Sequence, residues 1–197
     1  MSKGFTQFNS AKGNLTGFTL TEILVTVTLF VLILGAVFSS YLLSQRGYLE
    51  GERSSELAQN GRVILERTTR EIRQARGTVT ELPVDLASAT STIEFEDGNI
   101  SERYHYIHYF KDNSEVKREV KRYYFSEDPN TFVIWSATPP PGEHLVSTVT
   151  QPAQTVGEFV QDLNFWSSQI AVVNVLVNLE KQGKLVDFST RIFGRNL

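Results

Sequence analysis

The order of hydrophobic and polar positions divides the chain into four stretches. Residues 1–17 are mostly polar, whereas residues 18–38 are apolar and contain one charged residue, Glu22. As a helix rising 1.5 Å per residue, residues 18–38 would be about 32 Å long, enough to cross the core of a bilayer. We therefore expect a transmembrane helix over residues 18–38.

Residues 39–77 continue the helical pattern in amphipathic form. Apolar residues recur at spacings of seven or eight, and charged residues fill much of the remainder. The apolar stripe comprises Tyr41, Leu42, Tyr48, Leu49, Leu57, Ile64, Leu65 and Ile72. No proline occurs before Pro83, so one helix can run out of the membrane segment, with Gly77 as its expected end.

After Gly77 the pattern changes to a period of two, which is typical of β-strands. The clearest case places Val173, Val175 and Val177 on one face and Asn174 on the other. Strands are expected at residues 92–96, 102–110, 116–125, 131–135, 163–167, 171–180 and 185–193, with turns at 97–99, 112–114, 128–130 and 182–184. Short connections favour antiparallel pairing. The sequence predicts an α+β fold, in which the long helix packs on a mostly antiparallel β-rich domain over residues 78–197.

The composition narrows the function classes. The chain has 197 residues, a formal charge of -3 and no cysteine, which excludes a disulfide scaffold and thiol chemistry. The mixed charges of residues 62–76 indicate a solvated helix face, so we predict no binding of nucleic acid.

Candidate catalytic or metal-binding residues are few. His105 and His108 are three apart, which in one strand places them on opposite faces. The carboxylates Asp85, Glu94, Glu96, Asp97 and Glu102 match no known ligand loop, and Trp135 and Trp166 are expected in the core. No phosphate-binding, dinucleotide-binding or nucleophile motif is present. We predict no metal, no cofactor and no catalytic site.

The junction between residues 1–17 and the apolar stretch is the most informative part. The first 17 residues carry Lys3 and Lys12 and no acid, which favours a cytoplasmic N-terminus. A secretory signal would place its apolar run before the cut site, whereas here the apolar run follows Gly17. A carboxylate at the depth of Glu22 costs about 2.5–3.5 kcal/mol, so a residue kept there is expected to have a partner.

Gly17-Phe18-Thr19-Leu20-Thr21-Glu22 and the apolar run after it resemble the N-terminus of type IV prepilins and type II secretion pseudopilins. A weaker similarity to large minor pilins and J-type minor pseudopilins covers residues 56–60 and 70–75 and the end at Arg195-Asn196. Thr16 and Thr21 depart from the family, which more often has a basic and an aliphatic residue there.

This resemblance implies a processing and assembly pathway. A prepilin peptidase would cut between Gly17 and Phe18, removing residues 1–17, and would methylate the new amine of Phe18. Glu22 would then pair with the Phe18 amine of a neighbouring subunit during assembly. The expected partners are this peptidase and methyltransferase, other pilins or pseudopilins in a helical filament, the inner-membrane assembly platform and membrane lipid.

The same resemblance implies a location and leaves alternatives open. The protein would be a single-pass inner-membrane protein with an extracytoplasmic C-terminal domain, which later joins a filament at its tip or initiation complex. The alternatives are an anchored binding module, such as an adhesin, or an anchored enzyme. Leader removal distinguishes them, because a generic anchor keeps its N-terminus. The sequence does not choose among secretion, pilus and DNA-uptake systems.

Overall fold

The computed structural model describes residues 17–99 and 104–194. Its first element is one continuous helix, α1 (Leu20–Gln74), which joins the two helical stretches that the sequence predicts. Two compact units, Met1–Leu49 and Glu50–Leu197, divide the chain, and their boundary falls within α1. The helix ends at Gln74 because the Arg76 N–H donates to the carbonyl of Glu96, a residue of the first strand, at 3.2 Å, and not to a carbonyl within the helix.

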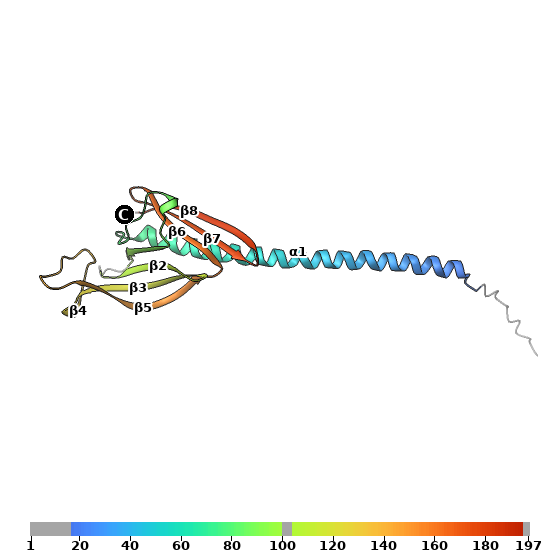
Figure 1. Cartoon of the computed structure of the whole chain (residues 1–197), viewed down its shortest axis with the longest axis horizontal. Coiled ribbons are helices and arrows are strands. Elements are labelled where there is room, and N and C mark those ends of the chain that lie inside the picture. Colours follow the sequence, from blue (N-terminus) through green and yellow to red (C-terminus); the bar gives the residue numbers. More distant parts are fainter. Residues whose placement is uncertain (1–16, 100–103, 195–197) are drawn as a thin grey trace, which may run out of the picture. The chain divides into compact units, whose positions relative to one another are not determined.

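The second unit contains two antiparallel sheets (Figure 1). The first sheet has the order β1-β2-β3-β4, with β5 paired to β3, and the second has the order β6-β7-β8. A short 3₁₀ helix, η1 (Leu86–Ser88), precedes β1. The strands are β1 (Thr92–Glu96), β2 (Tyr106–Asp112), β3 (Glu115–Phe125), β4 (Asp128–Val133), β5 (Leu145–Gly157), β6 (Val160–Gln169), β7 (Val172–Lys181) and β8 (Lys184–Phe193). The predicted α+β class, a long N-terminal helix on antiparallel sheets, is confirmed.

The strand predictions hold in part. All seven predicted strands overlap observed ones, but β5 was not predicted, because it contains Pro152 and its mostly exposed residues lack a clear alternation. The turn expected at residues 128–130 is wrong: Ser126 and Glu127 form the turn, and β4 begins at Asp128. Part of the predicted strand 102–110, including Glu102, lies outside the described residues, as do Arg195 and Asn196.

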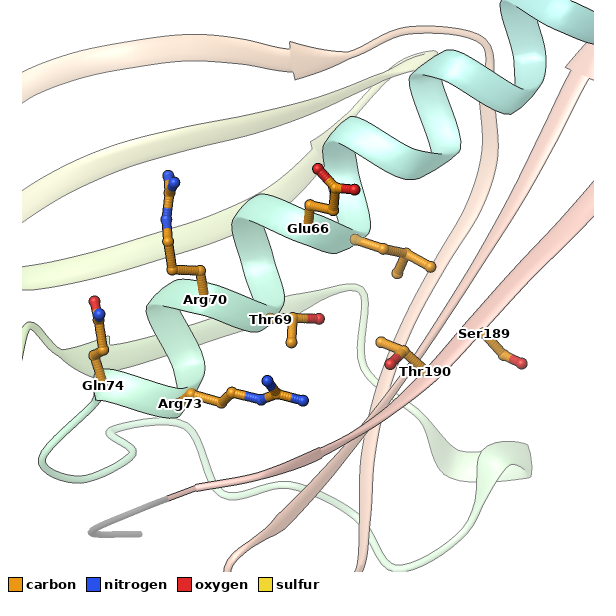
Figure 2. Close-up of a pocket in the computed structure, with 8 residues that line it drawn as sticks. Glu66, Thr69, Arg70, Arg73, Gln74, Ser189 and Thr190 are labelled. Carbon is orange, nitrogen blue, oxygen red and sulfur yellow. The ribbon is translucent and has the colours of Figure 1, made fainter.

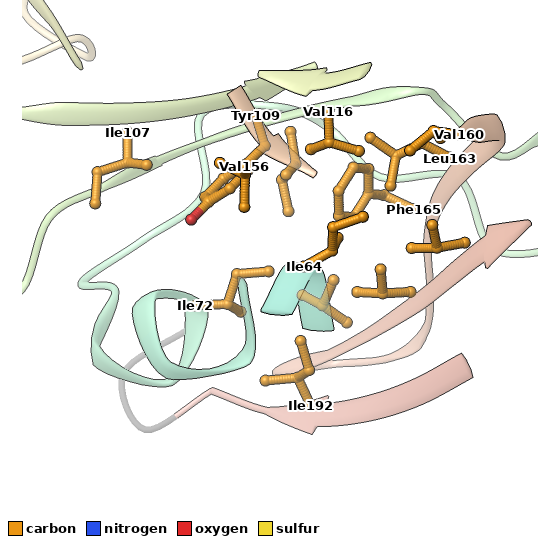
Figure 3. Close-up of a cluster of buried hydrophobic side chains, with 14 of the residues drawn as sticks. Ile64, Ile72, Ile107, Tyr109, Val116, Val156, Val160, Leu163, Phe165 and Ile192 are labelled. Atoms are coloured by element: carbon orange, nitrogen blue, oxygen red, sulfur yellow. The ribbon is translucent and has the colours of Figure 1, made fainter. Parts of the chain in front are cut away.

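The core lies where α1 meets both sheets. Leu57, Ile64 and Ile72, three of the residues in the predicted stripe, are fully buried there. Figure 3 shows Ile64 and Ile72 surrounded by side chains of both sheets, including Tyr109 and Phe165. The expectation that Trp135 belongs to the core is wrong. Trp135 is 38% exposed and lies in the loop after β4.

Two glycines allow the close approach of α1 to the sheets. A Cβ atom at Gly61 of α1 would lie 2.4 Å from the Phe188 ring on β8. A Cβ atom at Gly157 of β5 would lie 2.4 Å from Ile64 of α1. Gly61, which in the sequence is only a weak helix former, is therefore required by the packing of α1 on the second sheet.

A buried carboxylate holds α1 to the first sheet. Glu71, which the charge pattern places among the solvated residues, is only 9% exposed. Its Oε2 accepts hydrogen bonds from Tyr109 Oη at 2.8 Å and from Arg118 Nε at 2.9 Å. Burial and the Glu71 carboxylate raise the pKa of Tyr109 well above its ordinary value, so its hydroxyl stays protonated and donates.

We predict that Glu71→Ala lowers the free energy of unfolding by about 3–5 kcal/mol, because the Arg118 side chain, only 12% exposed, would lose its carboxylate partner. Chemical denaturation of the full chain in detergent measures this. Glu66→Ala is the control, since the Glu66–Arg62 pair at 3.7 Å is exposed and should contribute about 0–1 kcal/mol. Equal losses of stability in Glu71→Ala and Glu66→Ala would contradict the role of Glu71 in holding α1 to the first sheet.

Candidate functional site

The candidate site predicted from the sequence lies where α1 begins. Gly17, Phe18 and Thr19 precede the helix, and Thr19 is its N-cap. The Glu22 N–H donates to Thr19 Oγ1 at 3.3 Å, as in a capping box, in which a Thr caps a helix and a Glu follows three residues later. The local sequence therefore fixes Glu22 in the first turn of α1.

Local effects do not account for a carboxylate at this position. A negative charge near a helix N-terminus contributes about 0.3–1 kcal/mol at exposed sites, less than the about 2.5–3.5 kcal/mol that a charge costs at the centre of a membrane-spanning helix. Within residues 17–99 and 104–194, the Glu22 carboxylate has neither an ion pair nor a hydrogen bond. The structure thus leaves Glu22 available to a partner from outside the chain.

The helix that follows Glu22 is apolar on all sides. Its most apolar window has a mean hydropathy of 2.5 and no buried residue, and the helix is long and apolar enough to span a membrane. Its few hydroxyls are satisfied within the helix: Thr26 donates to the Glu22 carbonyl at 2.7 Å and Thr28 to the Leu24 carbonyl at 2.8 Å. Such internal bonds let these side chains enter a medium without water.

His105 and His108 make hydrogen bonds to side chains of the first sheet. His105 lies before β2, so the expectation that both histidines share one strand is wrong. His105 contacts Arg122, and His108 on β2 lies between Thr92 of β1 and Glu119 of β3. No group of three or more His, Asp or Glu side chains that could hold a metal is found in the described part of the chain.

Thr92, His108 and Glu119 form a chain of hydroxyl, imidazole and carboxylate that resembles a nucleophile with its base. Thr92 Oγ1 lies 2.6 Å from His108 Nε2, and His108 Nδ1 lies 2.8 Å from Glu119 Oε1. However, the Thr92 hydroxyl donates to the Tyr109 carbonyl at 3.1 Å, whereas a nucleophile would donate to the ring. We interpret the group as a cross-strand hydrogen-bond network that joins β1, β2 and β3.

The carboxylates noted in the sequence do not converge on one site. Asp85 caps η1, because its Oδ1 accepts from the Ser88 N–H at 2.9 Å. Glu94 accepts from the Tyr123 hydroxyl, and Glu96 lies 3.8 Å from the Arg76 guanidinium. Asp97 accepts from the Asn99 N–H at 2.8 Å. Each of these four carboxylates has a structural role at its own position.

The cross-strand network predicts a loss of stability in acid. Burial opposes ionisation of Glu119, but hydrogen bonds from His108 and Lys121 outweigh it and hold the pKa of Glu119 below its ordinary value. A carboxyl with a lowered pKa stabilises the fold above its unfolded-state pKa of about 4.5, and this contribution disappears as the pH falls through the folded-state pKa.

We therefore predict that Glu119→Gln makes the melting temperature less dependent on pH between about 3 and 5. Thermal unfolding of the full chain in detergent across this range measures the slope. Glu66→Gln, at an exposed site, is the control and should leave the slope as in the wild type. An unchanged slope in Glu119→Gln would show that the network does not stabilise the ionised carboxylate.

Comparison of the chain with protein-family models, curated proteins and solved structures gives no match. The function of this chain is therefore inferred from its own residues. The prediction of Gly17, Phe18 and Glu22 as site residues depends on a segment that is local in sequence, and it stays a prediction. Sequence reasoning missed the network of Thr92, His108 and Glu119, which depends on the register of three strands.

Proposed function

We propose that the protein is a minor pilin or pseudopilin, a structural subunit rather than an enzyme. In this proposal, a prepilin peptidase cuts between Gly17 and Phe18 and methylates the Phe18 amine. The subunit then assembles at the tip or initiation complex of a type II secretion pseudopilus or a type IV pilus. The observation that carries the proposal is Glu22, a carboxylate without a partner in the described chain, at the start of an unburied apolar helix.

The surroundings of Gly17 support the cut site. A Cβ atom at Gly17 would have no atom of the described residues within 4 Å, so the fold itself does not require glycine there. A peptidase does, because its catalytic groups must approach an extended backbone closely, and a side chain would obstruct them. The requirement for glycine then comes from the processing enzyme.

The charge of Glu22 supports the docking role. Cutting after Gly17 creates a positively charged amine on Phe18. In an apolar filament core, this amine on one subunit and the Glu22 carboxylate on its neighbour would neutralise each other. The loss of one partner is strongly unfavourable, because the other charge remains buried and unpaired. The pair would therefore select processed subunits for assembly.

The location follows from the same features. Residues 18–38 would cross the inner membrane, with Lys3 and Lys12 on the cytoplasmic side. The two sheets would lie outside the cytoplasm, and the subunit would pass from membrane lipid into the filament through the assembly platform. No cofactor is needed for such a role.

We predict that Glu22→Ala and the isosteric Glu22→Gln leave leader removal intact but reduce incorporation into filaments, because the Phe18 amine of a neighbour would lose its counter-charge. Immunoblots separate precursor from mature protein, and sheared filament fractions give incorporation. Glu52→Ala, at another exposed carboxylate of α1, is the control and should assemble normally. Normal incorporation of both Glu22 variants would rule out the docking role.

A further inference from the structure

The outer strands of the two sheets differ in how their free edges are protected. The edge of β1 is covered by residues 77–80, since the Val79 N–H bonds to the Glu94 carbonyl at 2.8 Å. The edge of β6 bonds to Thr90 and to Pro83, and β4 and β5 contain register shifts. Such covers and irregularities prevent unwanted pairing with other strands.

β8 has none of these protections among the described residues. It pairs with β7 over ten residues, from Lys184 to Phe193, with no register shift and no proline. The two-residue turn Gln182-Gly183, with φ of 51° and 81°, joins the two strands. A long, regular edge of this kind is a ready template for another strand.

The register shows which backbone groups are free. In an antiparallel pair joined by a two-residue turn, the residues next to the turn exchange hydrogen bonds, and bonded positions then alternate. Lys184 pairs with Lys181 next to the turn, and at the other end the Gly194 N–H donates to the Ala171 carbonyl at 2.9 Å. Even-numbered positions therefore bond to β7, and the N–H and C=O groups of Leu185, Asp187, Ser189, Arg191 and Phe193 point to the open edge.

Two hollows, of about 510 and 550 Å³, lie between α1 and β8. Both are lined by Leu65 and Glu66, so they form one groove along this side of the helix. Figure 2 shows Thr69 and Arg73 of α1 directed across the first hollow toward Thr190 of β8. The groove provides space for the inward-facing side chains of an additional strand.

The groove carries an excess of positive charge. Arg62 is paired with Glu66 at 3.7 Å, but Arg70 and Arg73 have no ion-pair partner within the described residues. Both arginines are exposed, one turn of helix apart. A segment that enters the groove would be favoured if its side chains there were acidic.

We propose that the β8 edge and this groove bind an extended, acid-bearing segment of a neighbouring filament subunit, which extends the second sheet by one strand. Main-chain hydrogen bonds to the odd-numbered residues of β8 would supply affinity, and Arg70 and Arg73 would select acidic side chains. This inference rests on the proposed function, which supplies the neighbouring subunit.

The added strand is not the β8 edge of a second copy of this chain. Antiparallel pairing of two β8 edges would match Asp187 with Arg191 and Leu185 with Phe193, so a homodimer is chemically possible. That pairing needs a twofold axis, which points the two copies in opposite directions, whereas the subunits of a helical filament all point the same way.

Substitution at Ser189 tests the edge. Ser189→Pro removes an N–H that faces the open edge and leaves the bonds between β7 and β8 in place. We expect leader removal as in the wild type and about a tenfold drop in filament incorporation. Ser189→Ala keeps the N–H and should assemble normally. Wild-type incorporation of Ser189→Pro would overturn the proposal.

The groove is tested without changing the strand, which keeps the proposal falsifiable if Ser189→Pro fails to fold. The double variant Arg70→Glu, Arg73→Glu should also lower incorporation about tenfold. Arg53→Glu, on the same helix but outside the lining of both hollows, should not. Equal incorporation of the double variant and Arg53→Glu would contradict the selection of acidic side chains.

Residue-resolved hydrogen exchange separates this inference from the proposed function. Amides of Leu185, Asp187, Ser189, Arg191 and Phe193 should be slower to exchange in assembled wild-type protein than in unassembled Glu22→Ala protein. Assembly without this protection would overturn strand addition and leave the proposed function intact. Failure of the wild type to assemble would overturn both strand addition and the proposed function. Purified homodimers joined through β8 would overturn the proposal that a segment of a neighbouring filament subunit binds this edge, because a second copy of this chain would occupy it.

Discussion

The first half of α1 presents an apolar surface that nothing in the described chain covers, and the proposed membrane and filament settings both follow from this constraint. Leu20 is 81% exposed and Phe30 59%, and the apolar residues between them are similarly uncovered within the described chain. Burying one such side chain is worth about 1.5–3 kcal/mol, so the whole segment strongly favours an apolar environment. In the proposed function, a bilayer would provide this environment before assembly, and the helices of neighbouring subunits would provide it in a filament. In either apolar environment, the Glu22 carboxylate would be stabilised by pairing with a positive charge.

The same helix that requires an outside partner also completes the core of the second unit. From Leu57 onward, α1 is buried against both sheets, with Gly61 and Gly157 allowing close contact and Glu71 bonded to Tyr109 and Arg118. Its exposed side leaves the groove beside β8. One element therefore carries the stretch that is long and apolar enough to span a membrane, part of the core, and one wall of the proposed docking site.

Sequence patterns predicted the features that are local. The alternation at Val173, Val175 and Val177 identified β7, and the short segment Gly17 to Glu22 could be interpreted without a fold. Features that depend on contacts between residues far apart in the sequence could not be predicted from sequence patterns. Glu71 has the sequence pattern of a solvated residue, and its main partner is Arg118 of β3. β5 has no clear alternation because it is an exposed edge strand, and Thr92, His108 and Glu119 come together only through the register of three strands.

Intact-mass analysis of the protein extracted from its native membrane measures directly whether residues 1–17 have been removed and Phe18 methylated. We expect a mass that lacks residues 1–17 and carries one added methyl group, with the N-terminus at methylated Phe18. The same measurement on Gly17→Ala should show mostly precursor, which ties the cut to that glycine. A full-length mass for the wild-type chain would rule out the proposed processing and pairing, because the Phe18 amine that Glu22 is proposed to meet would not exist.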